Sequence, residues 1–123
     1  MSVMAAKDEL GRAGEDRAVE HLTRLGYRIL DRNWRCEEGE LDIVAQREGA
    51  LVFVEVKTRR TLDYGHPFEA IDERKRKRLW RLAHVWVRAH PMASAGRALR
   101  LDAIGIVGAD PALGGLEHLR DLR

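Results

Sequence analysis

The chain has 123 residues, 45% of them hydrophobic and 34% charged, and a net charge of +2 at pH 7. This composition is typical of a folded globular protein, so we expect a single domain over residues 1–123. The N-terminal sequence MSVMAAKDELGR has no apolar signal-peptide core, and the chain has no long apolar run, so we expect neither secretion nor a membrane span. Cys36 is the only cysteine, which excludes an intrachain disulfide and a cysteine-pair zinc site and favours a cytoplasmic location.

The first predicted element is a helix over residues 5–25, where apolar or small side chains recur every three or four positions. Gly26 follows the last apolar position and is expected to end the helix in a left-handed conformation. Gly11 and Gly14 lie inside the helix, where each glycine costs about 1 kcal/mol relative to alanine. They therefore predict a close backbone approach at both positions.

Three strands are predicted next, over residues 27–34, 40–46 and 51–58. The third is rich in β-branched and apolar residues, which favour a buried strand. The second and third are separated by a short turn at residues 47–50, so they are expected to form an antiparallel hairpin.

A long helix is predicted over residues 68–90. Pro67 can occupy the first helical position, where its missing N–H is not needed, and Pro91 is expected to stop the helix.

The remaining segments are a small-residue loop at 93–96, a strand at 99–107 and a short last strand within GLEHLRDL, residues 115–122. One helix, three strands, a second helix and further strands predict an α/β fold, with a mixed β-sheet flanked by helices.

The predicted hairpin contains three charged residues, Asp42, Glu55 and Lys57, in otherwise apolar strands. Charged side chains are rarely buried unless they are paired or hold a metal. A two-residue loop at 48–49 and a four-residue loop both place Asp42 opposite Glu55 and Glu40 opposite Lys57. Because side chains alternate along a strand, all four are expected on one face of the hairpin.

Opposed carboxylates at this spacing repel one another, and a divalent cation would reverse that repulsion. Oxygen ligands from Asp42 and Glu55, completed by water, are what Mg²⁺ or Mn²⁺ prefers. Lys57 would lie beside such a metal and could orient a water or neutralise charge on a phosphate. The alternative is an ordinary surface, with a Glu40–Lys57 ion pair and with arginine partners for the two acids.

Positive charge is concentrated in residues 72–81, DERKRKRLWR, which carry a net charge of +4. Such a run is either a solvated helix face or a surface that contacts nucleic-acid phosphates. Lys75 falls on the margin of the apolar stripe, with its stem packed. The candidate phosphate contacts are Arg74, Lys77, Arg78 and Arg81, extended by Arg59 and Arg60 directly after Lys57.

Three motifs, GELDIVA, VFVEVKTR and the preceding GRAGEDRAVEHLTRLGYRIL, resemble the YraN family of bacterial proteins, within the PD-(D/E)xK nuclease superfamily. The family is similar to archaeal Holliday junction resolvases. The resemblance implies a restriction-endonuclease-like fold in which Asp42 and Glu55 bind Mg²⁺ or Mn²⁺ and Lys57 is catalytic. It further implies that Glu15, on the first helix, is an acid that approaches the same metal. One departure is Leu41, which stands where the superfamily has proline before the aspartate.

The expected function is therefore that of a Mg²⁺-dependent endonuclease that hydrolyses phosphodiester bonds of DNA, with branched or structured DNA among the candidate substrates. The alternative is a nucleic-acid-binding module that keeps the fold but does not cut. DNA is the expected partner in both cases, and a homodimer is left open as the oligomeric state.

Overall fold

In the computed structural model, which describes residues 3–122, three helices and a short 3₁₀ helix surround five strands. No helix within this range is long and apolar enough to cross a membrane. The elements in chain order are α1 (Val3–Arg24), β1 (Arg28–Cys36), β2 (Gly39–Arg47), β3 (Ala50–Arg59), the 3₁₀ helix η1 (Pro67–Ala70), α2 (Glu73–Ala89), α3 (Pro91–Ser94), β4 (Ala98–Val107) and β5 (Gly115–Leu119).

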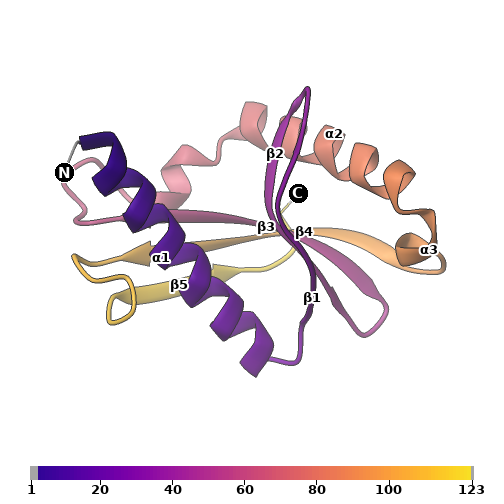
Figure 1. Ribbon diagram of the computed structural model, residues 1–123, viewed down its shortest axis with the longest axis horizontal. Coiled ribbons are helices and arrows are strands. Elements are labelled where there is room, and N and C mark those ends of the chain that lie inside the picture. The colour runs from indigo at the N-terminus through magenta and orange to yellow at the C-terminus, as the bar shows by residue number, and fades with distance from the viewer. Residues whose placement is uncertain (1–2, 123) are drawn as a thin grey trace.

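The strands form one mixed sheet in the order β1-β2-β3-β4-β5. Only the central pair, β3 and β4, is parallel; the other neighbours are antiparallel. Figure 1 shows the sheet strongly twisted, with α1 crossing one face and α2 lying on the other. The predicted α/β fold, with a mixed sheet between helices as in restriction-endonuclease-like domains, is confirmed.

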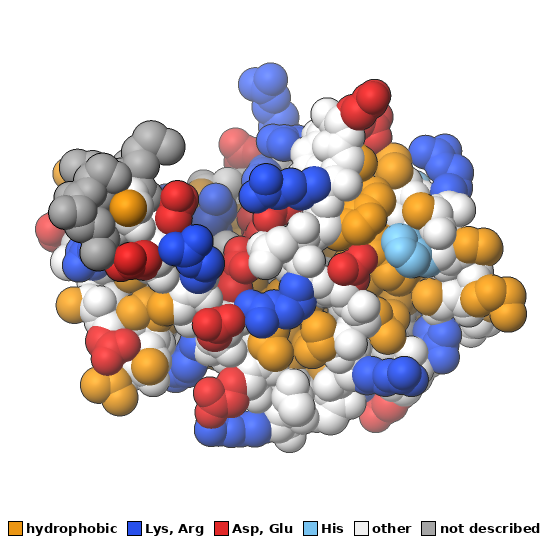
Figure 2. Space-filling view, viewed as in Figure 1, with side chains coloured by type: hydrophobic (Ala, Val, Ile, Leu, Met, Phe, Trp, Pro, Cys, Tyr) orange, Lys and Arg blue, Asp and Glu red, His pale blue; other side chains and the backbone are white. Residues whose placement is uncertain are grey.

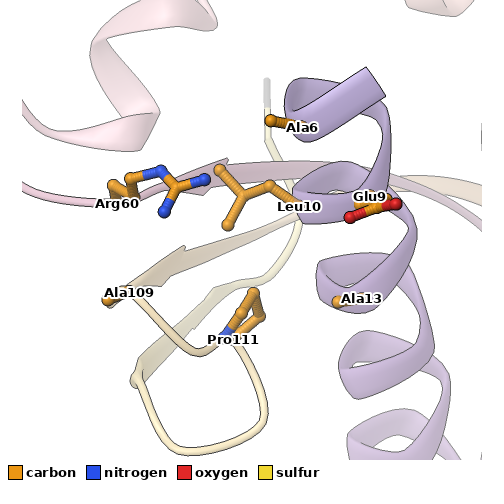
Figure 3. Close-up of a pocket in the computed structure, with 7 residues that line it drawn as sticks. All are labelled: Ala6, Glu9, Leu10, Ala13, Arg60, Ala109 and Pro111. Carbon is orange, nitrogen blue, oxygen red and sulfur yellow. The ribbon is translucent and has the colours of Figure 1, made fainter. Parts of the chain in front are cut away.

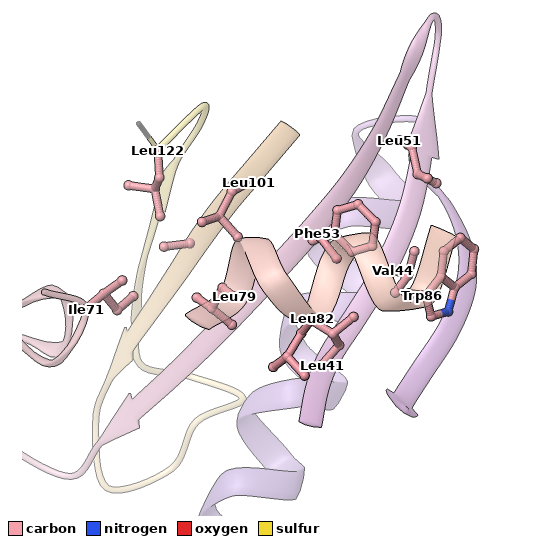
Figure 4. Packing of buried hydrophobic residues seen from close by; sticks show 12 residues of the cluster. Leu41, Val44, Leu51, Phe53, Ile71, Leu79, Leu82, Trp86, Leu101 and Leu122 are labelled. Atoms are coloured by element: carbon pink, nitrogen blue, oxygen red, sulfur yellow. The ribbon is translucent and has the colours of Figure 1, made fainter. Parts of the chain in front are cut away.

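Helix α2 covers its face of the sheet with apolar side chains spaced three and four residues apart. Trp86 packs edge-on against Phe53 of β3, with ring centroids 5.9 Å apart, and its indole N–H donates to Asp31 at 3.0 Å. Figure 4 shows Leu79 and Leu82 of α2 pointing at the sheet beside these rings. Burial of side chains of this size stabilises the fold by about 1.5–3 kcal/mol each.

Helix α1 covers the opposite face, where Ala18 and Leu22 are buried against Val52, Val54 and Ile104 of the two central strands. Strand β3 is therefore buried on both faces, since its alternate side chains enter the two cores. A charged side chain on β3 is therefore expected only toward the end of the strand, beyond the residues that the two helices cover on both faces.

Two of the three predicted glycine roles are confirmed. Gly26 ends α1 with φ +88°, and a Cβ on Gly14 would overlap the hydroxyl of Thr58, so Gly14 allows α1 to approach the end of β3. The expectation for Gly11 is wrong, because no atom lies within 4 Å of the position its Cβ would take.

The long helix predicted over residues 68–90 is in fact interrupted. It begins as η1, with Pro67 in its first turn, and breaks at Ile71 before α2 starts. The cause is Asp72, whose carboxylate accepts a hydrogen bond from the N–H of Lys75 at 2.8 Å and so caps α2. The predicted loop at 93–96 also begins within a short helix, α3, which starts at Pro91.

Candidate metal and nucleic-acid site

The site lies where β2 and β3 separate. Their ladder runs from Arg47 opposite Ala50, which is the two-residue loop of the two alternatives that the sequence left open, to Ile43 opposite Val54. Beyond that point β2 stays paired with β1 as far as Gly39, while β3 follows β4. Figure 1 shows the β1–β2 hairpin turning away from β3. We call this opening the fork.

Asp42 and Glu55 are the next two residues in this register, directly after the last ladder pair. Their side chains lie within hydrogen-bonding reach of one another. An oxygen of Asp42 also accepts from the N–H of Val56 at 2.9 Å, in place of the lost ladder bond. Glu55 is only 5% exposed, so the pair sits at the inner end of the fork.

Burial raises the pKa of both acids, and a neighbouring negative charge adds to this effect, from Asp42 on Glu55 and from Glu40 on Asp42. Burial raises the pKa of Glu55 to about 8, with a further contribution from the negative charge of Asp42, against the lowering effect of Lys75 and Lys57. Burial also raises the pKa of Asp42, although the hydrogen bond from Val56 opposes it. Near neutral pH the two carboxyl groups therefore retain a proton between them.

Two lysines flank the pair. Lys57, half-buried and two residues beyond Glu55, acts electrostatically on both acids. Lys75 places its Nζ 3.8 Å from Oε1 of Glu55 and reaches it from α2, on the far side of the sheet. The sequence placed Lys75 at the margin of the apolar stripe but gave no partner for it. The sequence feature that could have indicated this contact was the position of Lys75 in the first turn of α2, three residues after the cap residue Asp72.

Glu15 approaches from α1, next to the Gly14 contact with β3. Burial raises the pKa of Glu15, and the charges of Asp42 and Glu40 add to this, whereas a hydrogen bond from the Asn33 side chain lowers it. Glu15 therefore lies close enough to Asp42 for their charges to interact. Asn33, on β1 with φ 50°, was not predicted, and nothing in the sequence marks it.

The predicted pairing of Glu40 with Lys57 is wrong. Glu40 instead faces Arg35 on β1, and their side chains lie 3.4 Å apart. The physical reason is the fork, since Glu40 lies on the part of β2 that has already left β3.

The donors present suit a hard divalent cation. Asp42 and Glu55 offer carboxylate oxygens, which Mg²⁺ and Mn²⁺ prefer, and a cation between them would replace their shared proton. Within residues 3–122, however, no three His, Cys, Asp or Glu side chains are arranged to hold a metal ion. The fit is thus to a two-carboxylate site completed by water, with Glu15 outside the immediate pair.

Comparison with known proteins assigns the chain to a family. The model of the family described as "Uncharacterised protein family UPF0102" matches residues 14–106, a segment that contains Glu15 and the fork. The chain belongs to the UPF0102 family. The predicted family resemblance is confirmed at this level.

Relatives match over almost their whole length. A UPF0102 protein of Paenarthrobacter aurescens is 51% identical over 120 residues, covering 98% of both chains. Another, from Pseudarthrobacter chlorophenolicus, is 52% identical and covers 95% of this chain and 87% of the relative. One from Frankia casuarinae is 49% identical and covers 95% and 98%.

Beside the fork, the UPF0102 chain has a groove between α1 and the end of β3, about 410 Å³ in volume. We call it the α1 groove. It brings together Lys57 and the two basic residues predicted to follow it. Figure 2 shows acidic and basic side chains interspersed over the face that carries α1. The α1 groove is lined by Leu10, Gly11, Glu15, Val56, Lys57, Thr58, Arg59, Arg60 and Tyr64.

Helix α2 carries a second basic surface of this UPF0102 chain. A depression of about 380 Å³ is lined by Arg74, Lys75, Arg78 and Arg81, together with Ala70 and Asp72; we call it the α2 surface. Lys77 lies outside it and pairs with Glu73 at 3.3 Å. Because Lys75 both lines the α2 surface and contacts Glu55, the carboxylate pair lies between the α1 groove and the α2 surface.

Proposed function

We propose that this UPF0102 protein is a metal-dependent nuclease of the PD-(D/E)xK type, which hydrolyses phosphodiester bonds of DNA. The observation that carries the proposal is the close pair of buried Glu55 and half-buried Asp42, at the fork beside Lys57. Two adjacent carboxylates with raised pKa values are costly to the fold. A cation site explains why both are present.

Each residue has a distinct role in this proposal. Asp42 and Glu55 would hold Mg²⁺ or Mn²⁺, which would supply activation of water and neutralisation of charge on the phosphate. Lys57 directs its ammonium group at the reacting phosphate, where negative charge develops. Glu15, close to Asp42, accepts hydrogen bonds from water that enters from the α1 side.

The basic side chains on both sides of the fork support DNA as the substrate. Arg59 and Arg60 line the α1 groove, and Arg74, Arg78 and Arg81 line the α2 surface. Arginine is well suited to bidentate contacts with phosphate. A strand held at both surfaces would pass the carboxylate pair.

A second function is favoured by one contact. Since Lys75 already lies 3.8 Å from Glu55, the fork has a cationic partner without any metal. This contact supports a nucleic-acid-binding module that keeps the fold but does not cut.

The deciding experiment incubates the purified protein with linear, flapped and branched DNA in Mg²⁺, Mn²⁺ or EDTA. We expect metal-dependent cleavage of at least one substrate, and loss of cleavage in Asp42→Asn and Glu55→Gln. Cleavage by both variants at the wild-type rate would assign the activity to other residues or to a contaminant. Absence of cleavage by wild type on every substrate would leave the binding module in place of the nuclease.

A further inference from the structure

Tyr64 is the most exposed of the large hydrophobic side chains within residues 8–122, at 90%. It belongs to the loop between β3 and η1 and lines the α1 groove with Lys57 and Arg60. A single exposed aromatic side chain needs no explanation by itself. An aromatic ring beside basic side chains, in a groove that adjoins two acids, is the combination that single-stranded nucleic acid uses.

Gly11 supplies a second, independent observation. It weakens α1, yet the space at its missing Cβ is open, so no packing contact requires glycine there. Gly11 lines both the α1 groove and a neighbouring depression that includes Glu15 and Asn33. A side chain at this position would narrow the α1 groove where it passes Glu15.

The α1 groove also continues beyond Tyr64. Leu10 and Arg60 are shared with a pocket of about 220 Å³ that extends toward Pro111. Figure 3 shows Arg60 reaching from the end of β3 toward Leu10 on α1. The α1 groove and this pocket share Leu10 and Arg60 and so form a continuous path beside α1. Such a path fits one strand rather than a duplex.

We infer that the α1 groove binds a single DNA strand and that Tyr64 stacks one of its unpaired bases, so the substrate carries unpaired nucleotides next to the fork. This inference rests on the proposed nuclease function and names its substrate class. Inside a duplex the base faces are already stacked, whereas an unpaired base offers its face to an aromatic ring. Lys57, Arg59 and Arg60 provide the charge that complements the phosphates of that strand.

The test measures binding by fluorescence anisotropy with EDTA and with Ca²⁺, so that the DNA stays intact. The probes are a single strand, a blunt duplex and a flap, each with 2-aminopurine at one unpaired or paired position. We expect wild type to favour the single strand and the flap and to quench the unpaired 2-aminopurine. Tyr64→Ala should weaken single-strand binding by about fivefold or more and abolish the quenching, because one base stack is lost. Tyr64→Phe should retain both, because it keeps the ring.

Two further variants separate stacking from other effects. Leu62→Ala is the matched control, since Leu62 lies on the same loop and is 59% exposed but lines a different groove with His66. It should bind all probes as wild type does. Gly11→Leu, which meets no atom at its Cβ, should fold normally and yet weaken single-strand binding by filling the α1 groove.

The outcomes distinguish this inference from the function on which it rests. Wild-type affinity of Tyr64→Ala for the single strand, or equal wild-type affinity for single strand and duplex, would overturn the inference and leave a nuclease for duplex DNA. A wild-type protein that binds none of the probes would overturn both.

Discussion

Nζ of Lys75 lies 3.8 Å from Oε1 of Glu55, so a helix on one face of the sheet supplies a cation to the buried acid at the fork. Glu55 is the more buried partner. Lys75 lowers the pKa of Glu55, but burial and the charge of Asp42 raise it by more, so the net shift is upward. A metal ion at the fork must therefore displace the proton of Glu55 while the positive charge of Lys75 lies next to it.

Replacing Lys75 with glutamine should tighten Mn²⁺ binding. The lysine repels a divalent cation more strongly than it repels the single proton that the cation replaces, so removing it favours the metal. Isothermal titration calorimetry with Mn²⁺ measures the change, and Lys77→Gln, on the same helix but paired with Glu73, is the control. Weaker Mn²⁺ binding by Lys75→Gln would mean that the lysine organises the fork rather than competing with the cation.

Replacing Glu55 with glutamine should stabilise the metal-free protein near neutral pH. The folded pKa of Glu55 is about 8 and its ordinary value is 4.5, so the folded chain holds the extra proton in this window. Wild-type stability must then fall as the pH rises from about 4.5 to about 8, whereas glutamine has no proton to lose and can donate to Asp42.

Thermal unfolding in EDTA between about pH 5 and about pH 9 checks this prediction. The difference in Tm between Glu55→Gln and wild type should grow with pH. Glu73→Gln, an exposed acid on α2, should show no such trend. A difference that is constant with pH would mean that Glu55 is already ionised in the folded protein at pH 5.

The sequence predicted the carboxylate pair but not its surroundings. The hairpin register depends only on local loop geometry and side-chain alternation, so the positions of Asp42 and Glu55 followed from counting residues. The fork depends on β4 holding β3 while β2 stays in its hairpin with β1, and the β3–β4 pairing joins segments that are distant in the sequence. For that reason the Glu40–Lys57 pairing was wrong and the contact from Lys75 was missed.

The helices show the same division between local and distant causes. Periodicity predicted where α1 and α2 bury their apolar faces. The break at Ile71 was missed because the apolar pattern runs on through Asp72 without interruption. Asp72 suits a helix interior poorly and caps α2, but the periodicity alone did not show that it does so. Gly14 was explained by its contact with Thr58, whereas Gly11 requires a reason outside the core.

The α2 surface should contribute to DNA affinity through counterion release. Replacing Arg74 and Arg78 with alanine should weaken duplex binding and reduce the slope of log K against log salt by about 0.9 for each lost phosphate contact. The control removes Arg24 and Arg120, whose charges each act on His21 of α1. Equal slopes for the two double variants would show that α2 only faces solvent.

A second buried acid, Asp102 on β4, should be required for stability rather than for catalysis. It is 0% exposed and accepts hydrogen bonds from His118 at 2.8 Å, from Arg100 at 2.9 Å and from the N–H of Asp121 at 3.1 Å. Burial alone would raise the pKa of Asp102, but these hydrogen bonds outweigh it and lower the pKa to about 2. Its stabilising contribution is thus complete above its ordinary pKa of 3.8 and is lost as the pH falls toward 2.

Asp102→Asn should therefore lower the free energy of unfolding at pH 7 by about 2–3 kcal/mol, and the deficit should shrink below about pH 4. Urea unfolding across this range measures it, with the exposed Asp63→Asn as control. A deficit that persists unchanged at low pH would assign the loss to packing rather than to charge.

Replacing Lys57 with alanine should separate catalysis from binding. Lys57 lies beside the two acids, and its charge acts on both, so its effect is greatest where negative charge develops at one phosphate. Removing one such donor typically lowers the rate by about a hundredfold or more. Arg60 is exposed and lines the α1 groove, and in this proposal it would contact a phosphate distant from the chemistry, so Arg60→Ala should lose affinity and keep its rate at saturating DNA.

Single-turnover cleavage at saturating DNA, combined with gel-shift affinity for the same substrate, measures the two quantities separately. Lys57→Ala should bind DNA and Mn²⁺ nearly as wild type does but should barely cleave the substrate. Arg60→Ala should bind DNA more weakly and should cleave at the wild-type rate once the DNA is saturating. If Lys57→Ala cuts as fast as wild type, the ammonium group does not stabilise the transition state. If it loses affinity and rate in equal proportion at subsaturating DNA but keeps its saturating rate, Lys57 is a phosphate contact like Arg60, and the reaction depends on the carboxylate pair without it.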